Sequence, residues 1–163
     1  MATSHIILMP EAASFPSSNN AALAQVNLRK VLAFDAGTDE SCFWAFHAPQ
    51  ALAAGALSLV VSYIMASATT GTIDFEGDVE AVTSGDAFDL DAGDSFDTAN
   101  TMTADTVPGT AGYMKQFAIT LTNKDSIAVG DLVRVRLRRD ADDVSNDTAA
   151  GDCYVLAAEV REA

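Results

Sequence analysis

The residues best suited to chemistry lie in one acidic loop near the end of the chain. The loop offers five carboxylates, one amide and one guanidinium: Arg139, Asp140, Asp142, Asp143, Asn146, Asp147 and Asp152. Carboxylate and amide oxygens at such close spacing can bind Ca²⁺, although the loop lacks the residue pattern of an EF-hand. Because Arg138 and Arg139 directly precede Asp140, ion pairs and Asx turns account for the same residues. We expect a structural turn held by ion pairs, with a calcium site as the alternative.

The other constellations of catalysis and metal binding are absent from the sequence. Of the two histidines, His5 and His47, the second falls on the opposite strand face from Cys42, and a histidine at a strand end is more often structural than catalytic. A structural zinc site needs four Cys or His ligands in close pairs, and here they are isolated. Phosphate-binding glycine loops do not occur, and with 23 acidic residues a glycosidase-type carboxylate pair has no specificity. We therefore predict no enzyme, no catalytic, cofactor-binding or metal-binding residues, and no cofactor.

An aromatic segment contains the single tryptophan, Trp44, together with Phe43 and Phe46. Such a cluster can stack on sugar rings, but aromatic residues inside an apolar strand more often belong to the core. We predict the core, with the carbohydrate platform as the alternative. Cys42 and Cys153 each lie in an apolar run, so we predict buried free thiols rather than a disulfide framework.

Hydrophobic periodicity predicts the elements that must position these residues. Apolar and polar residues alternate with period two in several segments, as in half-buried strands, and no amphipathic helix is evident. We predict about eight strands that form an antiparallel jelly-roll sandwich. They span 26–34, 41–47, 55–68, 72–82 with a bulge at Gly77, 96–107, 113–123, 130–139 and 153–160, with a Gly/Asp loop over 84–95.

Two of these segments carry specific expectations. Gly130–Val160 is expected to form two paired strands joined by the acidic loop. One apolar face is predicted in the 55–68 strand and another in the last strand: Leu57, Leu59, Val61, Tyr63 and Met65, then Tyr154, Leu156, Ala158 and Val160.

The charge of the chain limits its partners. Its 163 residues carry a formal net charge of −14, and no Lys or Arg lies between Lys30 and Lys115. Nucleic acids and anionic membrane surfaces both attract basic residues, so neither is expected as a partner. Within this gap, ten acidic residues run from Asp74 to Asp105. We expect a solvated acidic face and loops, with a partner-facing patch or divalent cation sites as alternatives.

No segment predicts membrane insertion or export. Ala51–Ala68 is apolar, but it is interrupted by Gly55 and serines and lacks flanking basic residues, so we predict a strand. The first residues have no basic region ahead of a long apolar run, as a signal peptide would. Folding in the cytoplasm is the expectation.

Three stretches carry a family resemblance: CFWAFHAP (Cys42–Pro49), ATTGTIDFEGDVEAV (Ala68–Val82) and GDLVRVRLRRDADDVSNDTAAGDCYVLAAEV (Gly130–Val160). Together they resemble the small jelly-roll modules of tailed-bacteriophage virion proteins, over most of residues 40–161. The chain departs from that pattern where Ala45–Ala48 lengthens the step from the tryptophan to the proline, and where Thr70 replaces a serine.

The resemblance implies a structural role in a virion. Such modules serve as capsid cement or decoration proteins and as receptor-binding parts of fibres. Coiled-coil heptads and collagen-like repeats, which fibre shafts usually need, are absent. We therefore expect a capsid cement protein on the capsid surface, a homotrimer that binds the major capsid protein. Residues 1–24 are expected as an extended arm and 25–163 as the jelly-roll domain. A receptor- or glycan-binding module of a phage tail or head fibre is the alternative.

Overall fold

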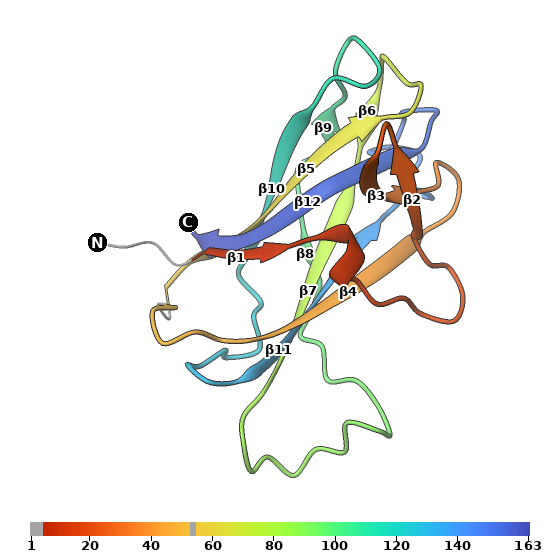
Figure 1. Cartoon of the computed structure of the whole chain (residues 1–163). Helices are drawn as coiled ribbons and strands as arrows, with labels where there is room; N and C mark the ends of the chain where they lie inside the picture. Colours follow the sequence, from red (N-terminus) through yellow and green to blue (C-terminus); the bar gives the residue numbers. More distant parts are fainter. Residues whose placement is uncertain (1–4, 53–54) are drawn as a thin grey trace.

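Antiparallel β-sheets form the body of the computed structural model, which describes residues 5–52 and 55–163 (Figure 1). The elements are β1 (His5–Leu8), the 3-10 helix η1 (Pro10–Ala12), β2 (Ala22–Val26), β3 (Arg29–Phe34), β4 (Glu40–His47), β5 (Leu57–Met65), β6 (Thr72–Ile73), β7 (Phe75–Val82), β8 (Asn100–Thr101), β9 (Asp105–Thr106), β10 (Lys115–Leu121), β11 (Leu132–Arg139) and β12 (Cys153–Glu162). The six-stranded sheet has the order β10-β5-β12-β3-β2, with β1 beside β12. The four-stranded sheet has the order β4-β11-β7-β8, and β6 pairs with β9. This confirms the predicted all-β jelly-roll sandwich.

The core lies between the two sheets and follows the predicted alternation. In β5 every second side chain is at most 1% exposed: Leu57, Leu59, Val61, Tyr63 and Met65. β10 contributes Phe117, Ile119 and Leu121, and the facing sheet contributes Val133, Val135 and Leu137 of β11. These residues are β-branched, leucine or aromatic, the types that favour a pleated and half-buried surface.

Strand boundaries differ from the prediction where turns interrupt a periodic segment. The strand predicted over 26–34 starts only at Arg29, because Asn27 and Leu28 adopt φ values of 43° and 64° and turn the chain between β2 and β3. Positive φ at both central residues is the geometry of a two-residue hairpin loop. Segment 72–82 divides at Asp74 into β6 and β7, and 96–107 holds only the short strands β8 and β9.

The last two long strands do not pair with each other, contrary to the prediction. β11 lies between β4 and β7 in the four-stranded sheet, whereas β12 lies between β5 and β3 in the other. The acidic loop therefore crosses from one sheet to the other. Period-two alternation identifies a strand but contains no information about its partner, which explains the error.

The predicted apolar face of β12 is half correct. A register shift between Val155 and Ala157 places a bulge in the strand. Ahead of it Cys153 and Val155 are buried, and after it Ala158 and Val160 are buried. Because the extra residue reverses the side-chain phase, Tyr154 and Leu156 are only partly covered.

No bulge occurs at Gly77. Its strand β7 keeps a continuous register with β11 from Phe75 to Val82. Gly77 instead faces the core, where a Cβ would lie 3.4–3.6 Å from the side chains of Leu121, Leu59 and Ile119. The glycine thus makes room for the opposite sheet.

The segment expected as an arm is extended, but its described residues lie on the sandwich. β1 pairs with β12, Ser14 exchanges backbone hydrogen bonds of 2.8 and 2.9 Å with Phe43, and Ala21 is fully buried. The expected domain boundary at residue 24 falls inside β2, which pairs with β3 over its whole length. Residues 5–24 therefore complete the fold; the start of the arm, residues 1–4, lies outside the described residues.

Among the described residues no helix is long and apolar enough to cross a membrane. The apolar segment 51–68 contains β5, as expected, and most of that strand is buried in the sandwich.

Candidate ligand-binding face

The outer face of the four-stranded sheet carries a row of charged side chains. Even-numbered residues of β11 point outward, so Arg134, Arg136 and Arg138 form one row. The neighbouring strand β7 lies in antiparallel register and places an acid opposite each arginine. Two patterns that are separate in the sequence thus become one ladder of ion pairs.

Each arginine of the row has an acidic partner. The distances are 2.6 Å from Arg134 Nε to Glu80 Oε2, 2.7 Å from Arg136 Nε to Asp78 Oδ2 and 2.5 Å from Arg138 Nη2 to Glu76 Oε2. Asp78 and Glu80 are only 2% and 1% exposed. The expectation of a solvated acidic face is therefore wrong for β7, because these carboxylates are covered and compensated.

Aromatic rings pack on the same ladder. The guanidinium carbon of Arg134 lies 4.9 Å from the ring centroid of Phe96 and 5.8 Å from that of Phe43. Arg136 lies 5.6 Å from the Phe96 ring. Cation–π contacts of this kind fix the guanidinium planes. The arginines of this face are therefore held by aromatic as well as by acidic side chains.

The loop over 83–99 covers part of the ladder. The backbone N–H of Ser95 donates to Glu80 Oε1 at 2.6 Å, and that of Asp97 donates to the carbonyl of Val79 at 2.9 Å. Arg134 also pairs with Asp94 from the same loop. The predicted loop 84–95 is confirmed, since this stretch has neither helix nor strand, and it extends from the lower end of the sandwich in Figure 1.

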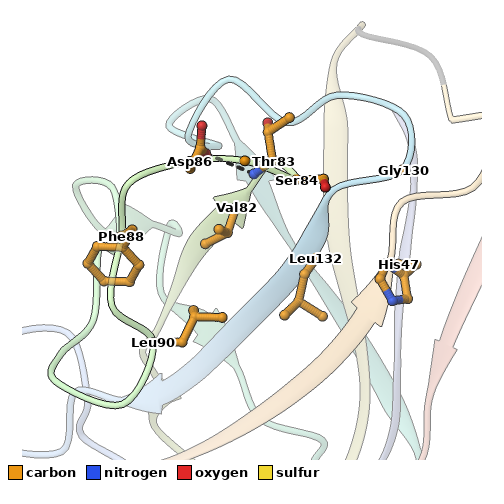
Figure 2. A pocket seen from close by; sticks show the side chains of 10 residues that line it. His47, Val82, Thr83, Ser84, Asp86, Phe88, Leu90, Gly130 and Leu132 are labelled. Atoms are coloured by element: carbon orange, nitrogen blue, oxygen red, sulfur yellow. Dashed lines mark hydrogen bonds between the residues drawn. The ribbon is translucent and has the colours of Figure 1, made fainter.

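A hollow of about 280 Å³ opens where this loop leaves the sheet (Figure 2). Its apolar surface comes from Val82 and Leu132, which are paired across the sheet, and from Phe88 and Leu90 of the loop. His47, at the end of β4, lies on the far side of Leu132 from Leu90 (Figure 2). The volume is near the lower end of small-molecule sites.

Polar groups form the rim of the hollow and order it. The backbone N–H of Thr83 donates to Asp86 Oδ2 at 2.9 Å, drawn as a dashed line in Figure 2. The Thr83 hydroxyl donates to Asp131 Oδ1 at 2.8 Å. Ser84 and His47 are exposed beside them. An apolar surface with hydroxyl, carboxylate and imidazole groups at its edge is suited to binding a polar molecule that has an apolar side.

The sequence did not identify Phe88 or Leu90 as binding residues. Both lie in a stretch interpreted only as a Gly/Asp loop. Leu90 is 54% exposed, and Phe88 is half-buried. Two large apolar residues within an otherwise acidic loop were the available signal, because a solvated loop has no need of them.

The acidic loop between β11 and β12 is held by ion pairs, as expected. Arg139 is fully buried and makes a two-pronged pair with Asp147, with 2.8 Å from Nε to Oδ2 and 2.7 Å from Nη2 to Oδ1. Arg138 is paired mainly with Glu76 rather than with Asp140, whose nearest oxygen is 3.9 Å away. The carboxylates of Asp39, Asp74, Asp140, Asp142 and Asp143 gather beside these pairs in two groups that share Asp140.

The aromatic segment of β4 belongs to the core, as predicted. Trp44 is 2% exposed, and its indole N–H donates to the carbonyl of Met9 at 2.9 Å. The alternative interpretation, in which Trp44 stacks on a sugar ring, is therefore wrong, because the indole ring is inaccessible. Cys42 and Cys153 are buried free thiols, and burial raises the pKa of both far above the ordinary value, which makes the thiolate inaccessible at neutral pH.

Sequence comparison finds no matching family model and no matching curated protein. Among solved structures, the chain is similar to a family 35 carbohydrate binding module from Clostridium thermocellum, with 15% identity, 98% of this chain and 99% of that chain covered, and a TM-score of 0.55. It is also similar to the CBM22-2 xylan-binding domain from Paenibacillus barcinonensis Xyn10C, with 10% identity, 97% and 99% covered, and a TM-score of 0.54. A third is a non-crystalline cellulose specific module, CBM28, with 14% identity, 94% and 89% covered, and a TM-score of 0.53. At such low identities the likeness shows the fold alone.

Proposed function

We propose that this chain is a non-catalytic binding module and that its ligand is a neutral carbohydrate. The observation that carries the proposal is the hollow beside Phe88, in which an apolar surface meets a polar rim. A sugar ring offers the complementary pair of surfaces, since its C–H faces are apolar and its edges carry hydroxyl groups. Phe88 and Leu132 would contact the ring face, and Ser84, Asp86 and His47 would bind the hydroxyls.

Two further observations support this proposal. The similar structures are described as carbohydrate-binding, xylan-binding or cellulose-specific modules, which favours a binding module over an enzyme. The net charge of −14 disfavours anionic polysaccharides, because they would be repelled by the acidic loop over 83–99. A neutral xylan- or cellulose-type chain is therefore the ligand class of choice.

Replacement of Phe88 by alanine tests the site. We expect Phe88→Ala to weaken binding of xylo- or cello-oligosaccharides roughly tenfold, because partial loss of the roughly 1.5–3 kcal/mol from burial of a Phe side chain suffices for about 1.4 kcal/mol, a factor of ten. Titration calorimetry of the full chain measures the effect. Leu28→Ala is the matched control, since Leu28 is 88% exposed on a different surface. The proposal fails if the unmodified chain binds no saccharide, or if Phe88→Ala binds as tightly as the control.

A second candidate function is the virion role implied by the resemblance to phage jelly-roll modules. The observation that favours it is a group of exposed apolar side chains on the first half of the chain: Ile7, Met9, Leu23 and Leu28. A hollow of about 400 Å³ between Met9, Leu28 and Leu156 adjoins Arg29 and Lys30. As a cement protein, a homotrimer would dock this surface on the major capsid protein, where multivalency adds up many weak contacts.

A single charge on that surface tests the second candidate. We expect Leu28→Asp to lower the number of copies on purified heads at least tenfold, since it places a carboxylate in an apolar contact. Quantitative mass spectrometry of particles reconstituted with the variant measures occupancy, with Val144→Asp as the control at another exposed apolar residue. Equal occupancy of both variants, or location at the tail tip alone, contradicts the cement role. Deletion of residues 1–24 is a poor test, because it removes β1 and part of β2.

A further inference from the structure

A group of carboxylates lies where the β6–β7 junction meets the loop after β11. Asp74 separates β6 from β7, and Asp140 is the first residue after β11. The backbone N–H of Asp140 donates to the carbonyl of Asp74 at 3.0 Å, which fixes the two segments together. One carboxylate oxygen each of Asp74, Asp140 and Asp143 lies within 4.8 Å of the other two. Opposite ligands of Ca²⁺ are separated by roughly 4.6–5.2 Å, so one ion fits among them.

The carboxylate of Asp74 has one oxygen that no described group satisfies. Its side chain is only 7% exposed, and its Oδ1 is buried without a hydrogen-bond partner in the described part of the chain. A buried carboxylate oxygen without a partner costs more than an ordinary unmade hydrogen bond, because it carries charge. Such an atom is rare in folded proteins, and an unseen ion is one of its ordinary explanations.

The neighbouring acids have close cationic partners, whereas among the described residues the closest ion pair of these three is the long one between Asp140 and Arg138. Asp147 is compensated by Arg139, and Glu76 by Arg138. Asp143 is held by the N–H groups of Ser145 and Asn146, which orient its carboxylate without neutralising it. The arginine nearest to Asp140, Arg138, stays 3.9 Å away. Negative charge therefore remains in excess at this point.

The pKa values agree with this geometry. Burial, followed by the charge of Glu76, raises the pKa of Asp140 to about 6. Burial also raises the pKa of Asp74, with Asp143 and Asp147 adding to it, against a hydrogen bond from the backbone of Phe75. Both directions reflect burial and the crowding of like charges at one point.

We propose that Asp74, Asp140 and Asp143 bind a calcium ion. All three donors are carboxylates, and hard oxygen ligands select Ca²⁺ or Mg²⁺ over zinc and copper. Ca²⁺ accepts irregular sets of six to eight oxygens, which suits ligands from two chain segments, whereas Mg²⁺ requires a near-ideal octahedron. Asp39 and Asp142 form a second group around the shared Asp140. Asp39 is already paired with Arg138 at 3.3 Å, so this second group is not part of the proposed site.

The ion would lock the crossover loop between the two sheets. Asp74 belongs to the β6–β7 junction, while Asp140 and Asp143 belong to the loop that leads from β11 to β12. Binding at this point is independent of the hollow beside Phe88, which none of the three residues lines. Stability and Ca²⁺ affinity, not saccharide affinity, are therefore the properties that report on it.

Calcium titration of the full chain tests the site. After treatment with EDTA and dialysis, we expect calorimetry with CaCl₂ to detect one ion per chain, with a Kd on the order of 10⁻⁴–10⁻³ M. The melting temperature should rise by about 3–6 °C at a tenfold excess of Ca²⁺ over Kd. Asp74→Asn keeps the shape of the side chain and removes its charge, and it should lower the affinity at least tenfold.

The matched control is Asp91→Asn, in the exposed loop over 83–99. It should bind Ca²⁺ and shift its melting temperature as the unmodified chain does. Three results overturn the proposal: no heat and no shift with the unmodified chain, an affinity of Asp74→Asn equal to that of Asp91→Asn, or equal affinities for Mg²⁺ and Ca²⁺. If Asp74→Asn is the more stable protein and Ca²⁺ has no effect, Asp74 is simply a buried protonated acid.

Discussion

Arg139→Met is expected to destabilise the protein by about 3–5 kcal/mol, because it leaves the carboxylate of Asp147 buried without its cation. Both side chains are at most 1% exposed. Arg139 also donates to the carbonyls of Phe34, Ala149 and Gly151, at 3.3, 3.3 and 3.0 Å. The guanidinium thus links the two sheets to the crossover loop. Urea-induced unfolding followed by circular dichroism measures the loss.

A second variant separates charge from packing. Arg139→Met/Asp147→Asn leaves no uncompensated charge, while the Asn oxygen can still accept from the backbone N–H of Asp74. We expect the double variant to recover at least half of the lost stability, because the penalty of the single variant is chiefly that of an unpaired buried charge. The exposed Arg29 provides the control, and Arg29→Met should stay within about 0.5 kcal/mol of the unmodified chain. Equal stabilities of Arg139→Met and Arg29→Met would contradict the structural role.

Trp44→Ala is expected to cost about 3–5 kcal/mol, the usual range for removal of a fully buried large aromatic side chain. The ring fills the core behind β4, and its N–H donor anchors the segment between β1 and η1 through the carbonyl of Met9. The variant therefore should loosen the N-terminal strand as well as the core. Hydrogen exchange at the β1–β12 pairing, measured beside global unfolding, reports on both effects.

Trp44→Phe tests the two contributions separately. It retains an aromatic ring and loses the hydrogen bond to Met9, so its cost should fall well below that of Trp44→Ala. Leu28→Ala, at a residue that is 88% exposed, should be close to neutral. If Trp44→Ala leaves the stability unchanged, Trp44 lies at the surface. The interpretation of the β4 aromatic residues as a carbohydrate-binding platform would then be the better one.

The arginines of β11 show which features of a strand can be predicted from the sequence and which cannot. Alternation correctly predicts one apolar and one charged face, and the same parity places Arg139 on the apolar side with Val133. Burial of Arg139 was therefore signalled by its position in the strand, but it was not among the predictions. Which acids meet the row is decided by the register of β7 against β11, and register depends on contacts between segments far apart in the chain.

The candidate sites likewise combine residues that the sequence identified with residues that only the tertiary structure brings to them. Asp140 and Asp143 were recognisable as possible ligands, but Asp74 was seen only as part of an acidic run. The tertiary structure brings it against them, because the crossover from β11 to β12 passes over the β6–β7 junction. The hollow beside Phe88 likewise exists only because the loop over 83–99 folds back against the ends of β7 and β11.

By itself the sequence determined the all-β class, most core faces, the loop over 84–95 and the two buried thiols. These features are local, since the alternation of a strand and the turn propensity of Gly and Asp need no distant partner. Only the tertiary structure decided that β11 and β12 belong to different sheets, that residues 5–24 pack on the sandwich, and where the carboxylates gather. Those outcomes depend on non-local pairing, whose energy comes from burial and charge compensation between segments that the sequence keeps apart.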